Sequence, residues 1–193
     1  MPFDTKGPGE KLYIPLHGRM IEFEIDKAII ADSQTTPQVT LKIPGITAAA
    51  STLPDLKDET ALLGFQYSAG RDSSAITAGS VAATGRLVAS RLLFVMPPGR
   101  IAVEIAKHLK MPPIPALEIL QYAVIDKHVI TLRHVFNSCT VVDMVVGQYA
   151  VAFLVSFQEL KVSAKDHKGT TMDETGTNEF ELMFAAGKVE DVK

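Results

Sequence analysis

Few residues of this chain have the types and spacing that metal binding requires. Its histidines lie at scattered positions: His17, His108, His128, His134 and His167. A metal site needs His, Cys or acidic ligands at short intervals, and none of these histidines forms such a pattern. His128 and His134 would share one face of a strand, but six residues of strand separate them by roughly 20 Å, which is too far for one ion. The sequence therefore predicts no metal ion.

No segment forms a recognisable catalytic motif either. The residue types of a Ser-His-Asp catalytic triad are present, for example as Ser73, His108 and Asp126. However, no serine lies in the sequence motif of a nucleophile elbow. Gly7–Lys11 superficially resembles a phosphate loop, yet it lacks the spacing and the preceding strand. Asp166–Gly169 lacks the alternating acids of a calcium loop and is typical of a solvated turn. We predict no catalytic residues, no cofactor and no enzymatic activity.

The composition is typical of one domain, or of one domain with an additional arm. Of 193 residues, 47% are hydrophobic and 21% are charged, which suggests that other subunits cover some apolar surface. The net charge of −3 argues against nucleic acid as a partner, because that binding depends on clustered Lys and Arg. The only cysteine, Cys139, lies in an apolar run, so we expect a buried, unreactive thiol and no intrachain disulfide.

No segment has the pattern of a targeting or membrane sequence. Residues 1–11 lack the apolar core of a cleaved signal peptide. No window contains the ~18 uninterrupted apolar residues of a membrane helix. We expect a chain that is made in the cytoplasm, is not inserted in a membrane, and leaves the cell, if it does, without a cleaved signal.

Residues 1–38 are predicted to form an N-terminal arm that precedes the main domain, residues 39–193. Two runs in the arm alternate between apolar and polar or small residues; their apolar positions are Leu12, Ile14 and Leu16, then Ile21, Phe23 and Ile25. This alternation predicts a β-hairpin with one apolar face. The polar segment 32–38 predicts a connector.

The first half of the main domain is predicted to alternate short strands with long loops. We expect strands over Val39–Ile43 and Leu62–Tyr67. The loop between them, Ala48–Glu59, has a length that is typical of functional or interaction segments. A second loop is predicted over 75–84, where Ala, Ser, Thr and Gly dominate.

One amphipathic helix is expected, over Arg100–Lys110. Prolines precede and follow this segment, and Ile101, Ile105 and Leu109 form an apolar stripe at helical spacing. Later strands are predicted at 116–124, 128–136, 139–146, 149–162 and 180–184. Short polar connectors, Asn137–Ser138 among them, indicate an antiparallel β-sandwich or barrel. Several strands carry apolar residues on both faces, so one face must meet another sheet or another subunit.

The order of these segments resembles the haemolysin-coregulated protein, Hcp, the tube protein of bacterial type VI secretion systems. Val39–Ile46 is similar to the first strand and turn of that family. Ala61–Gly70 resembles its next strand, with Tyr67 at or near a position where the family often has tryptophan, a residue this chain lacks. Thr84–Val88 and Ala152–Val162 resemble later strands. The arm before Val39 is longer than the usual N-terminus of the family.

The resemblance implies a wall protein rather than an enzyme. Six subunits would form a ring whose sheets join edge to edge, and rings would stack into a hollow tube for effector delivery. The implied partners are further copies of the chain, a contractile sheath, a spike protein and effector proteins. The chain would be cytoplasmic when assembled and secreted to the exterior or a target cell.

Two loops are the candidate contacts between subunits or rings, because they are long, polar and poor in core residues. The candidate residues are Ala48, Ala49, Ala50, Ser51, Thr52, Leu53, Pro54, Asp55, Leu56, Arg71, Asp72, Ser73 and Ser74. Two alternatives stay open on sequence grounds. One is a tube protein of a phage tail or another contractile injection system, and the other is an unrelated ligand-binding β-sandwich.

Overall fold

The computed structural model describes residues 9–16, 19–71, 87–124, 128–168 and 173–184. Within these ranges the protein is mainly β-structure, and all pairings between strands are antiparallel. The strands of these ranges form one 9-stranded sheet and two 2-stranded sheets. The predicted fold class, mainly β and antiparallel, is confirmed. None of the described helices is long and apolar enough to cross a membrane.

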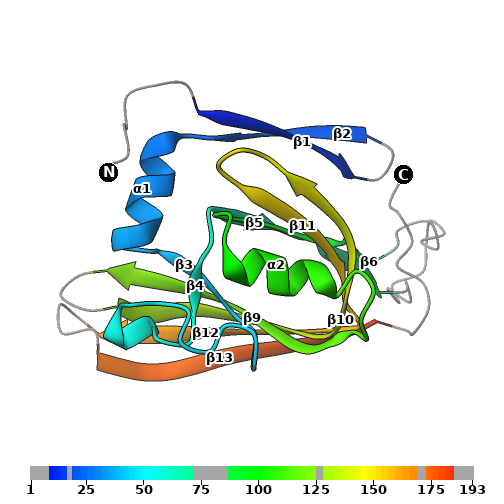
Figure 1. Cartoon of the computed structure of the whole chain (residues 1–193). Coiled ribbons are helices and arrows are strands. Elements are labelled where there is room, and N and C mark those ends of the chain that lie inside the picture. Colours follow the sequence, from blue (N-terminus) through cyan, green and yellow to red (C-terminus); the bar gives the residue numbers. More distant parts are fainter. Residues whose placement is uncertain (1–8, 17–18, 72–86, 125–127, 169–172, 185–193) are drawn as a thin grey trace.

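The large sheet folds into two layers. Its strands are β3 (Val39–Lys42), β4 (Thr60–Ala61), β5 (Gly64–Gln66), β8 (Leu92–Met96), β9 (Ile114–Val124), β10 (His128–Val146), β11 (Val151–Ser156), β12 (Glu159–Lys168) and β13 (Asp173–Met183). The long strand β10 belongs to both layers, because its first half pairs with β9 and β12 and its second half with β11. In Figure 1, β9, β12 and β13 lie in the lower layer, and β5 and β11 lie in the upper one.

The two layers meet at a bend in neighbouring strands. Asn137 of β10 pairs with the first residue of β12, and Thr140 pairs with the last residue of β11. Between them Ser138 has a φ of 53°. The predicted connector at Asn137–Ser138 is therefore wrong, and the run 149–162, predicted as one strand, is two. A strand that passes from one layer to the other bends through an irregular residue at the corner instead of ending.

The ends of other strands also differ from the prediction. The strand expected over Leu62–Tyr67 is limited to β5, and the strand expected at 180–184 begins at Asp173. β12 continues to Lys168, so most of the predicted turn at 166–169 belongs to a strand. Polar residues lie in these long strands because neighbouring strands supply the backbone hydrogen bonds, whatever the side-chain pattern.

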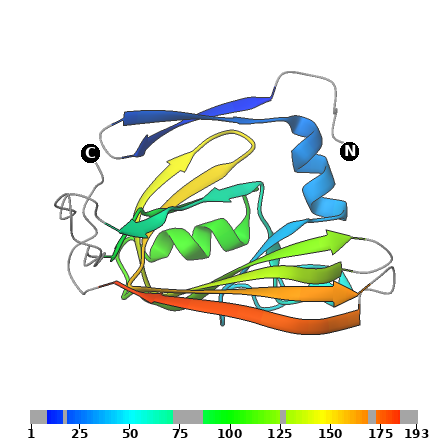
Figure 2. The ribbon, with the colours of Figure 1, turned by 180° about the vertical axis from the view of Figure 1, so that it is seen from behind.

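The helix α2 (Arg100–Lys107) lies between the two layers (Figures 1 and 2). It buries Ile101 and Ile105 against the main core, which confirms the predicted helix and most of its stripe. Leu109 is the exception, with 41% of its surface exposed. The helix ends at Lys107, and the N–H of Leu109 donates to the carbonyl of Ala106 in a tighter final turn.

The N-terminal arm contains a hairpin and a second helix. Strands β1 (Glu10–Leu16) and β2 (Arg19–Ile25) pair as predicted, with Leu12 opposite Phe23. Helix α1 (Lys27–Thr35) follows, where the sequence predicted a connector from residue 32 and no helix. The Asp26 carboxylate accepts a hydrogen bond from the N–H of Ala28 at 2.9 Å and so caps this helix. The expectation of a single helix is wrong, because α1 lacks the apolar stripe by which a helix is recognised.

The arm covers the outer face of the upper layer. Strand β8 alternates between two clusters: Leu92, Phe94 and Met96 face the main core, whereas Leu93 and Val95 face the arm. Ala152 and Leu154 of β11 face the arm as well, where they meet Leu12, Ile14, Ile25 and Ile30. The apolar residues on both faces of these strands are thus explained by the chain's own arm, which lies above the upper layer in Figure 1.

Candidate assembly surfaces

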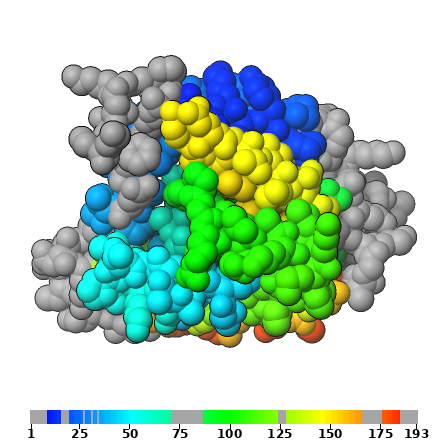
Figure 3. All heavy atoms as spheres, viewed as in Figure 1, coloured from blue at the N-terminus to red at the C-terminus, as the bar shows by residue number. Residues whose placement is uncertain are grey.

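The loop between β3 and β4 carries most of the predicted contact residues. It contains a short 3-10 helix, η1 (Pro54–Leu56). Leu56 is buried with 2% of its surface exposed, so it anchors the loop and is not available for contact. Of the predicted contact residues in this loop, the exposed ones are Ala48, Ala49, Thr52, Pro54 and Asp55. Figure 3 shows this loop, in cyan, beside α2, in green, on one face of the molecule.

Hydrogen bonds hold this loop in one conformation. The Thr47 hydroxyl accepts from the N–H of Ile43 at 2.9 Å and donates to the carbonyl of Asp58 at 2.7 Å, which ties the two ends together. The Asp58 carboxylate accepts from the N–H of Ala49 at 3.0 Å, where the backbone has a φ of 52°. The loop is therefore a preformed projection, and a contact through it would not first have to order the backbone.

Of the second predicted contact segment, the structure describes Arg71 alone, which lies in a different sheet from β3 and β4. Arg71 ends β6 (Ala69–Arg71), which pairs with β7 (Leu87–Ala89) in a sheet of its own. Asp72, Ser73 and Ser74 lie outside the described residues. The structure thus does not bring Arg71 into the loop between β3 and β4.

Strand β13 is a long sheet edge that the prediction missed. It pairs with β12 on one side, and no other strand in the described part of the chain pairs with its second side. Phe180 has 53% and Met183 has 65% of its surface exposed on this strand. The sequence feature that could have indicated an exposed strand is an aromatic residue between two acids, Glu179–Glu181. An exposed edge of this kind can pair with a strand of another chain.

The outer face of the lower layer is polar and carries both signs of charge. Lys42, Glu118, Val135, Lys161 and Glu181 form one row across five strands. A guanidinium nitrogen of Arg133 lies 2.9 Å from the carboxylate of Glu118, and the Lys161 ammonium lies 2.8 Å from Glu179. The bond to Glu118 raises the pKa of Arg133. Ion pairs near the surface are screened by water and stabilise little, so they make the face soluble more than they make it stable.

A buried histidine lies among aromatic rings in the core. The His134 side chain has its Nδ1 2.9 Å from the Tyr67 hydroxyl and its Nε2 3.1 Å from the Gln121 amide nitrogen. Phe65 and Tyr67 contact its ring edge to face. Burial lowers the pKa of His134 and raises that of Tyr67. With both ring nitrogens within hydrogen-bond distance of a neighbouring side chain, this cluster is suited to packing rather than to proton transfer.

The described residues contain no group of three or more His, Cys, Asp or Glu placed to hold a metal ion. Cys139 is fully buried, as the sequence predicted, and burial raises the pKa of its thiol to about 12. The thiol is therefore protonated and a poor nucleophile at neutral pH. The chemically notable features of the described residues are surfaces: a rigid loop, the edge of β13 that no other described strand pairs with, and a polar sheet face.

Neither protein-family models nor curated protein sequences match this chain. Solved structures do. A structure described as a type six secretion system protein is 14% identical, with a TM-score of 0.65 over 78% of this chain and 97% of that one. Hcp1 from Salmonella typhimurium is 19% identical, with a TM-score of 0.59 over 78% and 96%. The secreted protein Hcp3 from Pseudomonas aeruginosa is 9% identical, with a TM-score of 0.52 over 76% and 97%.

This chain has the Hcp fold. The resemblance found in the sequence is confirmed at the level of the fold. The Hcp fold takes up 96% of Hcp1 but 78% of this chain, so this chain carries residues that the solved protein lacks. Tyr67, which the resemblance placed at or near the family's tryptophan position, is partly buried against the main core. Its ring contacts Phe136 and Phe157 edge to face, at centroid distances of 5.2 and 6.5 Å.

Proposed function

We propose that this chain is a structural subunit of the inner tube of a type VI secretion system. Six copies form a ring, rings stack into a hollow tube, and the tube delivers effector proteins. The observation that carries the proposal is the match of the chain to nearly the whole length of several Hcp structures with TM-scores above 0.5. A subunit of a tube wall acts through its contact surfaces and needs no active site. The distinctive features of this chain are surfaces as well, which supports the proposal.

The physical argument for a ring starts at the edge of the lower layer. Among the described strands, β13 pairs only with β12, and a long exposed edge in a monomer invites uncontrolled pairing. A head-to-tail contact that closes into a ring occupies such an edge in every copy. We place the loop residues Ala48–Asp55 and the segment 71–74 at contacts between subunits or rings, as the sequence suggested.

The remaining parts of the proposal follow from the same assembly. The tube domain is 39–193 and the arm is 1–38. The partners are further copies of this chain, a contractile sheath, a spike protein and effectors, with no catalytic role, cofactor or nucleic acid. The tube assembles in the cytoplasm and reaches the exterior or a target cell when the sheath contracts.

The test is the assembly state of the purified protein. Light scattering coupled to size exclusion should give a mass about six times the 20.9 kDa of the chain, and negative stain should show rings or stacked tubes. A monomer at all concentrations would overturn the proposal.

A second candidate is a tube protein of a phage tail or of another contractile injection system. The residues that this chain has beyond the solved Hcp structures favour it, because an added arm suits a different set of neighbours. A ligand-binding β-sandwich is less well supported. One pocket beside α1 and another at the loop between β3 and β4 have volumes of about 260 and 240 Å³, below the ~300–1,000 Å³ of most small-molecule sites.

A further inference from the structure

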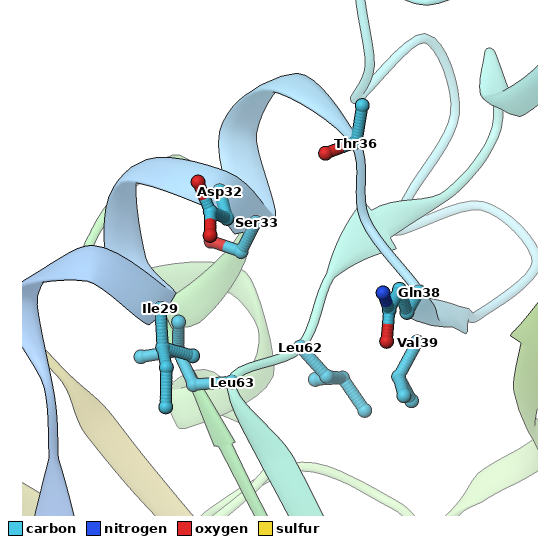
Figure 4. A pocket seen from close by; sticks show the side chains of 8 residues that line it. All are labelled: Ile29, Asp32, Ser33, Thr36, Gln38, Val39, Leu62 and Leu63. Carbon is cyan, nitrogen blue, oxygen red and sulfur yellow. The ribbon is translucent and has the colours of Figure 1, made fainter. Parts of the chain in front are cut away.

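Two pockets lie near α1. The first, of about 260 Å³, lies between α1 and the chain that connects β4 to β5. In Figure 4, Ile29 lies beside Leu63 and Leu62 beside Val39, with Asp32 above them. The second, of about 240 Å³, is lined by α1 and the loop between β3 and β4. We call the first pocket, which α1 walls on one side, the α1 groove.

The α1 groove has an apolar floor and an acidic rim. Val39, Leu62 and Leu63 line the first pocket, and the Asp32 carboxylate lies at its exposed side. None of the described residues that line either pocket is Lys or Arg. The chemistry that fits is a short protein segment with apolar side chains and one basic residue.

The segment that follows α2 has the complementary chemistry. Leu109, Lys110 and Met111, which we call the α2 knob, are all exposed, with 41% of Leu109 and 51% of Met111 accessible. His108 Nδ1 lies 2.9 Å from the carbonyl of Pro112, a contact that spans the knob and holds its turn. The knob thus presents two apolar side chains and an ammonium group from a fixed backbone.

The knob cannot fill the groove of its own chain. α2 runs away from α1 and ends at the opposite side of the molecule, and the two views from front and back agree on this (Figures 1 and 2). A second copy is the occupant that brings the two surfaces together, and such a contact joins unlike faces of identical chains. Contacts of this type generate rings or filaments.

We propose that the α2 knob of one copy docks in the α1 groove of the next, with Lys110 facing Asp32. This contact rests on the proposed function, since it supplies one of the joints of the ring. It also gives the N-terminal arm a role, because α1 supplies one wall of the groove.

Disulfide trapping tests the contact directly. Ile29 has 49% and Met111 has 51% of its surface exposed, and native Cys139 is buried, so new thiols would react selectively. The variant Ile29→Cys/Met111→Cys should give a ladder of covalent multimers under mild oxidation. Ile29→Cys alone and Met111→Cys alone should stay monomeric on a denaturing gel, because a head-to-tail contact never places like positions together. Covalent dimers from either single variant, or no ladder from the double variant in assembled protein, would overturn the proposal.

A charge exchange gives an independent readout. Asp32→Lys and Lys110→Asp should each raise the concentration needed for assembly by about tenfold, because like charges then meet at every contact. A mixture of the two variants should assemble as the wild type does, since alternating copies restore opposite charges at every joint. Glu24→Lys, which reverses a charge on the exposed face of the hairpin, is the matched control and should have no effect.

The results separate this contact from the proposed function. If the wild type forms rings and neither the trapping nor the charge exchange has the expected effect, the contact is wrong and the tube proposal stands. If the wild type remains monomeric at all concentrations, both the contact and the tube proposal are wrong.

Discussion

The Glu10 carboxylate in β1 accepts a hydrogen bond from the backbone N–H of Tyr149 at 2.7 Å, in the turn between β10 and β11. The same carboxylate accepts from the N–H of Gln148. Beside this contact, Gly147 leaves the space into which Glu10 and Leu12 reach. One acidic side chain of the arm thus satisfies two backbone donors of the main domain and fixes how the hairpin sits on the upper layer.

Gly147→Ala is expected to loosen the arm. A Cβ at residue 147 would overlap Oε1 of Glu10 and lie 2.5 Å from Cδ2 of Leu12, so both side chains must shift and the two hydrogen bonds weaken. We expect a loss of about 1–3 kcal/mol in the free energy of unfolding and faster proteolysis of the arm. Urea unfolding and limited proteolysis measure these effects. Gly70→Ala is the control, because a Cβ there meets nothing within 4 Å; equal losses in the two variants would contradict the contact.

Truncating an aromatic ring should destabilise the protein much more in the core than at the edge strand. Phe136 is fully buried and its ring centroid lies 4.9 Å from that of Phe157, so Phe136→Ala should lower the free energy of unfolding by about 3–5 kcal/mol. Phe180, with 53% of its surface exposed, should lose less than about 1 kcal/mol when changed to Ala. Denaturant unfolding at low protein concentration compares the two, and similar losses would mean that β13 is covered within the monomer.

The buried His134 should make stability depend on pH. Its pKa in the folded protein is lowered from the usual 6.5, so the unfolded chain binds a proton first as the pH falls. The free energy of unfolding should therefore decrease from about pH 6.5 down to the folded pKa and then level off. Urea unfolding between pH 8 and 5 measures this slope. His134→Gln, which keeps a hydrogen-bonding side chain beside Tyr67 but cannot titrate, should show a shallower slope; an unchanged slope would assign the effect to other groups.

The exposed tip of the loop between β3 and β4 should affect assembly but not folding. Thr52→Arg/Asp55→Arg places two long cations where the proposed contact forms, while Leu56 and the hydrogen bonds of Thr47 stay in place. We expect a normal unfolding midpoint and a shift from rings to smaller species, measured by light scattering after size exclusion. If rings of normal size persist, the loop is not at a contact between subunits.

The hairpin, the helix α2, the buried Cys139 and most of the strands could be predicted, because each leaves a pattern in a few neighbouring residues. Leu12 and Ile14 alternate with polar residues, and Ile101 and Ile105 recur at helical spacing. α1 could not be recognised in this way. Ile29 and Ile30 are adjacent rather than spaced along one face, and what identifies the helix is its cap at Asp26, a polar residue in a polar segment.

The sequence by itself determined the mainly β class, the hairpin face, α2 and the resemblance to Hcp, since periodicity and local order are properties of the chain. Only the tertiary structure decided that β10 bends at Ser138 instead of ending, that Leu93 and Leu154 meet the arm, and that β13 is an edge. These are relations between segments far apart in the chain. The sequence shows that an apolar residue tends to be buried. It does not show which segment covers that residue, because the hydrophobic effect has no preferred direction.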